Sequence, residues 1–355
     1  MSKTAAAAVV LTAAAVVAAT PGVASAVSAP LSCARITAHF DLARQQTPEN
    51  IALAPDGSAY VTFAAARQVA RITPGGSTRI LATLPAPADG GVHTPVLGFA
   101  LTTGIVRAQD GTLYFLYAAG TADLTGVWRL RPGGTPQRIA ALPAAGLPNG
   151  LALDPRTRTL YITDSVLGTI SSVPTTGGTP HTWSTAPELA STGFLGANGL
   201  KIRGGALWAT NLDRGTVLRI PVQRDGRAGP VQTRATGLAG IDDFAFTGHG
   251  DQILAALNGP GEVALVQSDG THSTVLTAAD GLQNPTSIAL RDDTAHVLSA
   301  AYVTAKDPNL LLAHLNDQTA VVRVITTAVS GRPLPERQKQ QPWRRARSRH
   351  RTSLL

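Results

Sequence analysis

The sequence is poor in cysteine and has no extended helical pattern. Cys33 is the only cysteine among 355 residues, which excludes an internal disulfide bond. Stability must come from a hydrophobic core, for which about 300 residues are enough. A lone cysteine is rarely a nucleophile, so we interpret Cys33 as a small apolar residue in an N-terminal strand. No stretch has apolar residues at helical spacing, while 35 glycines and 24 prolines supply many turns. The chain is therefore expected to be all-β.

Hydrophobic runs long enough to cross a membrane are also missing. The most extended one, residues 5–19, is rich in alanine and shorter than the roughly 20 residues of a membrane helix. It follows the basic Lys3 and precedes a small-x-small site ending at Ala26, which is typical of a secretory signal peptide. We expect residues 1–26 to be removed after Ala26 and the mature protein to be secreted. A lipoprotein attached through Cys33 is an alternative, although the three preceding residues match the usual Leu-Ala-Gly sequence poorly.

Excess charge is confined to the two ends of the chain. The formal net charge is +8. Residues 331–355 carry eight Lys or Arg against Glu336, and Lys3 adds one more, so the residues between them are neutral overall. A neutral body has no electrostatic reason to bind nucleic acid. The Pro-, Gln- and Arg-rich tail is expected to be disordered and solvated, with contact to an anionic cell-wall polymer as the alternative.

A hairpin pattern recurs six times between these ends. In residues 146–165 a polar residue, Asn149, precedes an alternating apolar strand, a polar turn and a second apolar strand. The six leading positions are Glu49, Thr103, Asn149, Asn198, Asp242 and Thr286. They lie 44–54 residues apart, and such a period with about four short strands per unit predicts a β-propeller. We expect six four-stranded antiparallel blades around a central axis, within residues 27–330.

The predicted ring needs a strand to close it. Residues 35–42 alternate between apolar and polar side chains and precede the first hairpin without a partner of their own. Propellers commonly pair a terminal strand with the last blade, which removes an exposed sheet edge. We expect residues 35–42 to complete blade six, with residues 321–327 as the alternative.

The leading residues are the candidate functional site. Each begins the innermost strand of its blade, so a propeller would bring all six together at one face of the axis. Glu49, Asn149, Asn198 and Asp242 carry carboxylate or amide oxygens, which are ligands of hard cations such as Ca²⁺. They would give a site of formal charge −2 with positions left for water and substrate. The alternative is that the leading residues only cap strand starts through side-chain turns.

Two of these positions lie in the segments Leu-Pro-Asn149-Gly-Leu and Gly-Ala-Asn198-Gly-Leu. Residues 36–315 resemble the senescence marker protein / gluconolactonase (regucalcin-like) family of six-bladed propellers. The resemblance implies a divalent cation, usually calcium, held at the axis by one Glu, two Asn and one Asp from blades one, three, four and five. Glu49, Asn149, Asn198 and Asp242 match that set in type, order and blade. The resemblance also implies hydrolysis of a lactone.

The same residues suggest a mechanism. A cation at this place would polarise an ester or lactone carbonyl and activate a bound water, and a neighbouring carboxylate would serve as base. We expect Asp242 or Glu49 to act as this base. Asp243 is the second choice, because strand alternation would turn it away from the site.

The surroundings of the site are apolar where sugar-lactone hydrolases of the family are polar. Those enzymes place an arginine two residues before the first Asn, where this chain has Leu147. Other nearby positions are also apolar, namely Phe63, Leu97, Phe99, Phe194 and Leu195. We expect a substrate pocket formed by Thr103, Leu147, Phe99, Phe194 and Thr286. Such a pocket suits a less polar ester or lactone, and ordinary packing of these side chains is the alternative.

Other catalytic arrangements find no support. The eight histidines show no metal-ligand spacing, and no Gly-x-Ser-x-Gly elbow occurs. Four polar residues that follow second strands are expected to cap turns, at the opposite end of the strands from the leading residues: Asp164, Asn211, Asp213 and Asn258. Two functions stay open. One is a secreted calcium-dependent hydrolase of a small-molecule lactone or ester, and the other is a non-catalytic propeller that binds a protein or cell-wall ligand around a structural ion.

Overall fold

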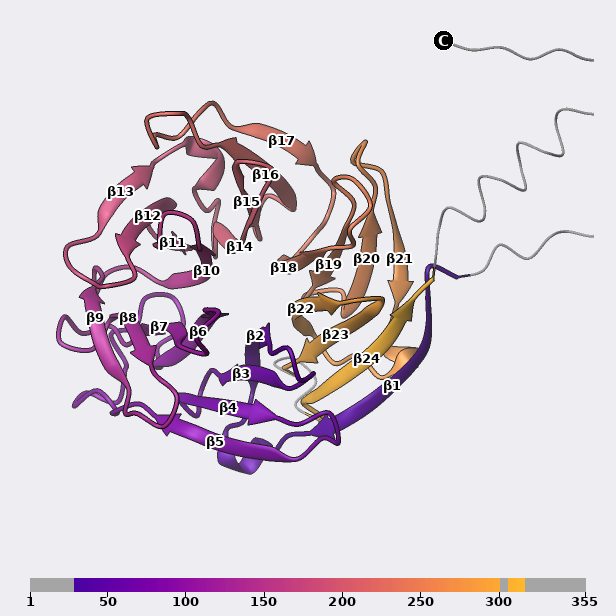
Figure 1. Ribbon diagram of the computed structural model, residues 1–355, viewed down its shortest axis with the longest axis horizontal. Coiled ribbons are helices and arrows are strands. Elements are labelled where there is room, and N and C mark those ends of the chain that lie inside the picture. The colour runs from indigo at the N-terminus through magenta and orange to yellow at the C-terminus, as the bar shows by residue number, and fades with distance from the viewer. Residues whose placement is uncertain (1–28, 301–305, 317–355) are drawn as a thin grey trace, which may run out of the picture. The chain divides into compact units, whose positions relative to one another are not determined.

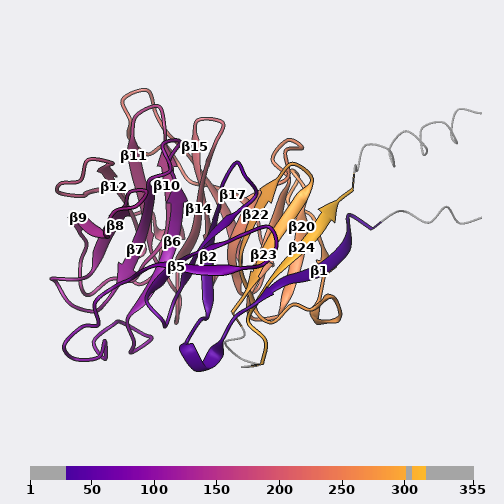
Figure 2. The ribbon, with the colours of Figure 1, turned by 60° about the horizontal axis from the view of Figure 1, so that its bottom comes forward.

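The computed structural model describes residues 29–300 and 306–316, which form six four-stranded antiparallel sheets arranged in a ring (Figure 1). The predicted six-bladed β-propeller is confirmed. One strand of each sheet lies nearest the centre and another forms the rim, and Figure 2 shows the blades side by side around the ring. The expected leader, residues 1–26, and the expected tail, residues 331–355, lie outside the described residues.

The first three blades run in chain order from the innermost strand to the outermost. Blade one contains β2 (Pro48–Leu53), β3 (Ala59–Phe63), β4 (Gln68–Ile72) and β5 (Thr78–Thr83). Blade two contains β6 (Leu101–Arg107), β7 (Leu113–Ala118), β8 (Gly126–Leu130) and β9 (Gln137–Ala141). Blade three contains β10 (Pro148–Asp154), β11 (Thr159–Asp164), β12 (Thr169–Pro174) and β13 (His181–Ser184).

The next two blades repeat this order, and the last one includes the first strand of the chain. Blade four contains β14 (Ala197–Arg203), β15 (Ala206–Asn211), β16 (Thr216–Pro221) and β17 (Gln232–Ala235). Blade five contains β18 (Ile241–Phe246), β19 (Ile253–Leu257), β20 (Glu262–Val266) and β21 (His272–Leu276). Blade six contains β22 (Pro285–Arg291), β23 (Thr294–Ser299), β24 (Asn309–Leu315) and β1 (Leu31–His39). Three short 3-10 turns are also present: η1 (Leu42–Arg44), η2 (Pro187–Leu189) and η3 (Ala278–Asp280).

β1 closes the ring by pairing antiparallel with β24. This confirms the closing role predicted for residues 35–42, but the strand lies a few residues earlier in the chain. It ends early because Asp41 caps η1, where its carboxylate accepts a backbone N–H at 2.9 Å. Cys33 lies in β1 as expected and is exposed. The alternative closing strand, residues 321–327, lies outside the described residues.

The hydrophobic core is divided among the six gaps between neighbouring blades. Each gap contains one cluster of buried apolar side chains. Between blades one and two this cluster includes Val69, Leu113 and Phe115. Burial of both faces of every blade explains the long apolar runs in the strands. A seventh, smaller cluster, which includes Leu101 and Leu147, lies against the axis.

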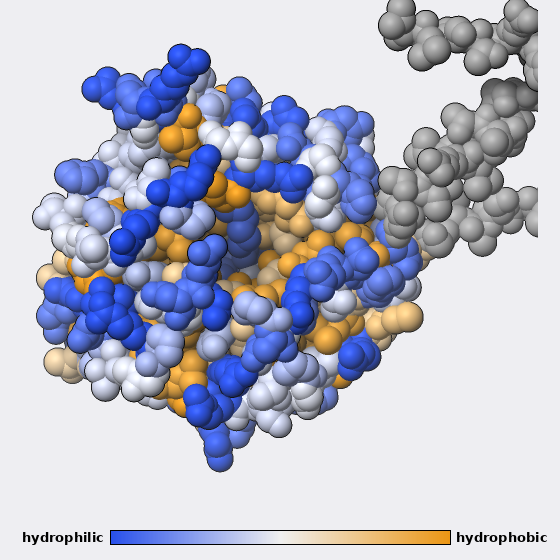
Figure 3. Space-filling view, viewed as in Figure 1, coloured by the Kyte–Doolittle hydropathy of each residue, from blue (hydrophilic) through white to orange (hydrophobic). Residues whose placement is uncertain are grey.

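The inner strands begin and end at two hollows on the axis. Their first residues line a cavity of about 340 Å³, and their later residues line a wider hollow of about 510 Å³. Figure 3 shows one face of the ring, hollowed at its centre, with apolar side chains in the hollow and hydrophilic ones around it. Within the described residues, no helix is long and apolar enough to cross a membrane.

Candidate metal site at the ring axis

Each inner strand is bulged where its leading residue lies. In blade three, Asn149 and Gly150 of β10 together oppose the single Thr163 of β11. The other five inner strands have a register irregularity at the same place. A bulge bends its strand and redirects the side chains within it. The leading position is therefore a repeated backbone distortion as well as a repeated residue.

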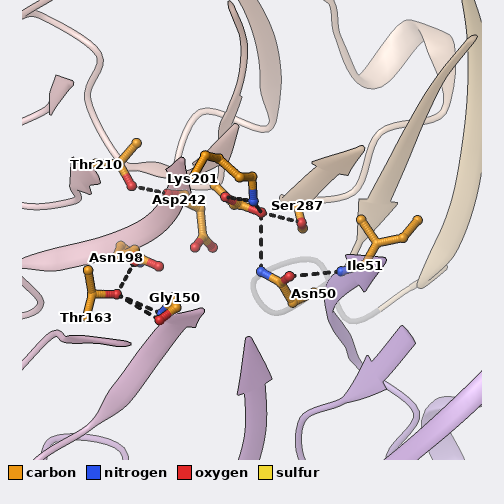
Figure 4. Close-up of polar contacts among 10 residues, drawn as sticks. Asn50, Ile51, Gly150, Thr163, Asn198, Lys201, Thr210, Asp242 and Ser287 are labelled. Carbon is orange, nitrogen blue, oxygen red and sulfur yellow. Dashed lines mark hydrogen bonds and ion pairs between the residues drawn. The ribbon is translucent and has the colours of Figure 1, made fainter. Parts of the chain in front are cut away.

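Threonine hydroxyls hold these distorted segments in place. Three threonines share one position on the second strand of their blade, and each hydroxyl donates to the carbonyl oxygen of the leading residue in the next blade. One pair is Thr62 with Thr103 (2.7 Å). Figure 4 shows the other two, Thr163 with Asn198 and Thr210 with Asp242 (2.5 Å). Because the bonds join separate blades, they fix the leading residues relative to one another.

The glycine that follows each leading asparagine has a steric cause. A Cβ atom on Gly150 would overlap the carbonyl oxygen of Asn198 in the next blade. Gly199 is equally crowded, because a Cβ there would lie 2.6 Å from Oδ1 of Asp243. The inner strands approach so closely at this level that no side chain fits between them. The Asn-Gly pairs therefore report close packing of neighbouring blades.

The structure brings the four predicted ligands to one cavity. Glu49, Asn149, Asn198 and Asp242 all line the cavity of about 340 Å³ at the start of the inner strands. All four are buried, with 2–8% of their surface exposed. Asn149 donates through Nδ2 to Oγ of Ser165 (3.1 Å), which turns its carbonyl oxygen away from Ser165. Figure 4 shows the side chains of Asn198 and Asp242 extending from neighbouring inner strands.

Two carboxylates at close quarters make this cavity strongly acidic. Burial raises the pKa of Asp242 well above its ordinary value, and the charges of Glu49 and Asp243 raise it further. A hydrogen bond from Asn198 and the charge of Lys201 oppose this effect without cancelling it. A bound cation would remove the repulsion that raises this pKa.

The donor set fits a hard cation that accepts amide oxygens. Among the described residues, no group of three or more His, Cys, Asp or Glu side chains is placed to hold a metal. An ion in the cavity would therefore depend on the two amides as well as the two carboxylates. Calcium accepts both kinds of oxygen in a flexible geometry, whereas zinc prefers nitrogen and sulfur.

Asp243 faces away from the cavity, as alternation predicted, and the structure gives it a different role. Its side chain is 2% exposed and forms an ion pair with Lys201, with Nζ at 2.7 Å from Oδ1 and 2.8 Å from Oδ2. Oδ2 also accepts from Ser287 (2.6 Å) and Asn50 (3.2 Å) (Figure 4). Because its oxygens are occupied and it does not line the cavity, we withdraw Asp243 as a candidate base.

Most of the remaining cavity wall is apolar. Leu147, Phe99 and Phe194, which were predicted to form the pocket, line it. They are joined by four further leucines, Leu97, Leu101, Leu195 and Leu212. Phe63 was expected nearby, but it is fully buried between blades six and one. The wall therefore presents leucine and phenylalanine to any ligand that reaches the carboxylates.

One aspartate fixes the loop that carries part of this wall. The carboxylate of Asp213 accepts backbone N–H groups from four consecutive residues, 192–195, at 2.7–3.1 Å. Burial alone would raise the pKa of Asp213, but these hydrogen bonds outweigh burial and the pKa is lowered. The loop positions Phe194, which is 47% exposed, and Leu195 at the cavity.

Two predicted pocket residues do not line the cavity. Thr103 and Thr286 are fully buried, and their hydroxyls donate to backbone carbonyls of the next blade: Thr103 to Pro148 (2.8 Å) and Thr286 to Pro48 (3.1 Å). The threonine side chain is too short to reach past these carbonyls. Both residues connect neighbouring blades and lie outside the cavity lining.

The polar residues after the second strands lie at the cavity end, not at the opposite end as we expected. Antiparallel pairing places Asp164 opposite Pro148, beside the start of the inner strand. Asp164 caps the turn as predicted, because its carboxylate accepts the backbone N–H groups of Val166 (3.0 Å) and Leu167 (2.8 Å). Asn258 belongs to the same group and lines the cavity. The sequence already indicated antiparallel hairpins, and this pairing would have placed all four polar residues at the cavity end.

Comparison with known proteins supports the fold. No protein-family model and no curated protein matches the chain. Gluconolactonase from Xanthomonas campestris has a similar structure (15% identity, 81% of this chain and 97% of that chain, TM-score 0.57). So does the calcium-binding protein regucalcin from Agrobacterium tumefaciens (16% identity, 79% and 93%, TM-score 0.57). Virginiamycin B lyase from Staphylococcus aureus is a third such structure (16% identity, 80% and 100%, TM-score 0.54). At these identities the similarity establishes a shared propeller fold and leaves the activity open.

Proposed function

We propose that this protein is a calcium-dependent hydrolase of an apolar lactone or ester. The observation that carries the proposal is the meeting of Glu49, Asn149, Asn198 and Asp242 in one cavity with an apolar wall. Two of the structural neighbours, a gluconolactonase and the calcium-binding protein regucalcin, support the same proposal. Export through residues 1–26 is part of the proposal and rests on the sequence alone.

The residues of the cavity have separable tasks. Glu49, Asn149, Asn198 and Asp242 would hold the ion, which supplies a Lewis acid for the substrate carbonyl and lowers the pKa of a bound water. Glu49 and Asp242 are the only titratable side chains that line the cavity among the described residues. A proton released by the attacking water therefore goes to one of these carboxylates. The apolar wall excludes bulk water and strengthens the electrostatic interactions at the carbonyl.

The wall also defines the substrate class. Among the described residues that line the cavity there is no lysine, arginine or histidine, so an anionic group on the substrate would find no basic side chain there and would compete with the two carboxylates for the ion. Leu147 and Phe99 offer no hydrogen bond to the hydroxyls of a sugar. A volume of about 340 Å³ accommodates a small ligand. The substrate we propose is an uncharged lactone or ester with an alkyl or aryl group.

Lyase chemistry of the kind in the third structural neighbour is less well supported. In the Staphylococcus aureus lyase, replacing one histidine by alanine gives a catalytically inactive protein. In the present cavity no histidine of the described chain is available for that purpose. Hydrolysis assisted by the carboxylates needs no histidine.

The second candidate is a non-catalytic propeller with a structural ion, which binds a protein or a cell-wall ligand. One observation favours it: among the described residues, the carboxylates that line the cavity, Glu49 and Asp242, are both predicted ion ligands, so the described lining offers no separate base. Under this function the cavity would stabilise the ring without turning over a substrate.

Calcium titration together with a lactone and ester panel distinguishes the two functions. The hydrolase predicts that Asn149→Ala and Asp242→Ala lose both calcium binding and activity on apolar lactones. The matched control is Asn309→Ala, which removes a buried asparagine of β24 that bonds to Gly281 at 3.1 Å, away from the cavity. The control should lose stability and keep calcium affinity. Calcium binding by the wild type without activity on any substrate would establish the second function, and no calcium binding would contradict both.

A further inference from the structure

A groove between blades one and two is lined by arginine. Its volume is about 530 Å³, and it shares no residue with the axial cavity. Arg71 and Arg79 line it from blade one, and Arg107 and Arg131 line it from blade two. Among the described residues, Asp110 is the one acidic side chain in the lining. The groove therefore concentrates positive charge in a body that is neutral overall.

Two acidic side chains near these arginines compensate about half of this charge. Asp56 pairs with Arg71 through Nη2 at 2.6 Å, and the groups are about one third and one half exposed. Oδ1 of Asp110 accepts the backbone N–H of Thr112 at 2.9 Å. This hydrogen bond and, to a smaller extent, the charge of Arg107 lower the pKa of Asp110. Two carboxylates thus face four guanidinium groups.

The strand register places two of the arginines in direct opposition. Arg71 of β4 is the pairing partner of Arg79 of β5. Side chains at opposed positions of antiparallel strands have Cβ atoms roughly 5 Å apart, and like charges there destabilise the pair. Tyr60 of β3 continues the same row, opposite Arg71. The repulsion between Arg71 and Arg79 would be relieved by an anion held between their guanidinium groups.

Two of the guanidinium groups also contain buried nitrogen atoms that lack a partner. Nε of Arg71 and Nε of Arg107 are buried and form no hydrogen bond in the described part of the chain. A buried N–H without an acceptor is unfavourable and uncommon in folded proteins. These two arginines belong to opposite walls of the groove, so a ligand that contacted both guanidinium groups through their outer nitrogens would span it.

We propose that this groove binds a ligand with two linked phosphate groups, one held by Arg71 and Arg79 and the other by Arg107 and Arg131. Phosphate fits because the guanidinium fork donates two parallel hydrogen bonds to its oxygens. Two linked groups fit because the arginines come as one pair from each blade. The site is independent of the proposed hydrolase, since it lies outside the axial cavity.

Titration calorimetry of the full chain with inorganic pyrophosphate tests the proposal. Calcium-free buffer prevents chelation of the ion by pyrophosphate. We expect wild type to bind pyrophosphate at least tenfold more tightly than orthophosphate, because pyrophosphate offers one phosphate group to each pair of arginines. Arg79→Gln/Arg131→Gln should lose at least tenfold in pyrophosphate affinity. Both residues are exposed, so folding should survive. The matched control is Arg44→Gln/Arg227→Gln, which removes the same charge at side chains that are 78% and 84% exposed and lie outside the groove.

The melting temperature provides a second test, because a misfolded variant would melt below the wild-type temperature. Without anion, Arg79→Gln/Arg131→Gln should melt at or above the wild-type temperature, because the repulsion between Arg71 and Arg79 is gone. With pyrophosphate, the wild type and the control should melt at a higher temperature and the groove variant should not. Binding by the groove variant within twofold of wild type would overturn the proposal. So would an equal loss in the control, which would assign binding to net charge, or equal affinity for orthophosphate and pyrophosphate.

Discussion

Asp242 and Asp243 are neighbours in β18, yet only Asp243 forms an ion pair with a basic side chain. Asp243 is paired with Lys201 and receives further hydrogen bonds from Asn50 and Ser287. Asp242 shares its cavity with Glu49, and its pKa is raised by burial and by that second carboxylate. The chain thus neutralises Asp243 with its own Lys201.

The cavity that contains Asp242 differs in this respect. Among the described residues, no basic side chain lines it, and the neutral neighbours of Asp242 are amides, which can coordinate hard cations. Asp243 and its partners connect four blades without any ion. Under the proposed function, Asp242 would instead be neutralised by a bound calcium ion.

Among the predicted changes in the free energy of unfolding, we expect the largest from replacing Lys201. Lys201→Met leaves Asp243 buried without its cation, which typically destabilises a protein by about 3–5 kcal/mol. Urea denaturation at neutral pH measures the change. Lys201→Arg, which keeps the charge, should recover part of the loss. A free energy of unfolding within about 1 kcal/mol of wild type would show that Ser287 and Asn50 are sufficient partners.

Replacing Asp242 should have an effect that changes sign with calcium. Without calcium and above the raised pKa of Asp242, Asp242→Asn removes a buried charge beside Glu49. We therefore expect the variant to be more stable than wild type by about 1–3 kcal/mol, because the desolvation of a buried carboxylate is costly. With calcium, the wild type should gain stability through binding, and the variant should not. Denaturation with and without the ion measures both. A variant that is less stable than wild type under both conditions would contradict the comparison.

The same residue predicts a pH dependence. The folded pKa of Asp242 lies above the ordinary value of 3.8, so the folded state holds this proton more tightly than the unfolded state. Its contribution to stability is present below the unfolded pKa and is lost as pH rises through the folded pKa. The calcium-free protein should therefore lose stability over this range, and Asp242→Asn should not. Calcium affinity should fall as pH decreases through the same raised pKa, because the proton competes with the ion.

The sequence was sufficient for the fold and for the four cavity residues, because the repeat fixes both. A hairpin pattern at a period of 44–54 residues allows few architectures, and one position per repeat necessarily converges in a ring. The pattern also showed Asn149 and Asn198 followed by glycine. It did not show the reason, since the contact of Gly150 with Asn198 joins two blades.

The differences from the sequence predictions have two origins. Thr103 occupies a leading position, but its hydroxyl donates to a backbone carbonyl of the next blade, a contact that a single repeat does not contain. Asn258 was placed at the wrong end of its strand, although the antiparallel pairing within one hairpin would have placed it correctly. The opposition of Arg71 and Arg79 depends on the register of two outer strands, and nothing in the spacing of the arginines marks it.

The smallest expected effect concerns the threonines that connect the blades. Thr103→Val keeps the shape of the side chain but leaves the carbonyl of Pro148 without its donor, so stability should fall by about 1–3 kcal/mol. Calcium affinity and any turnover should stay unchanged, because Thr103 does not line the cavity. Thr286→Val, which removes the equivalent bond to Pro48, serves as the matched control and should behave alike. Denaturation and calcium titration measure the two properties separately. A loss of calcium affinity at unchanged stability would instead show that Thr103 contributes to the cavity. Residues that connect the blades could then no longer be separated from residues that bind the ion.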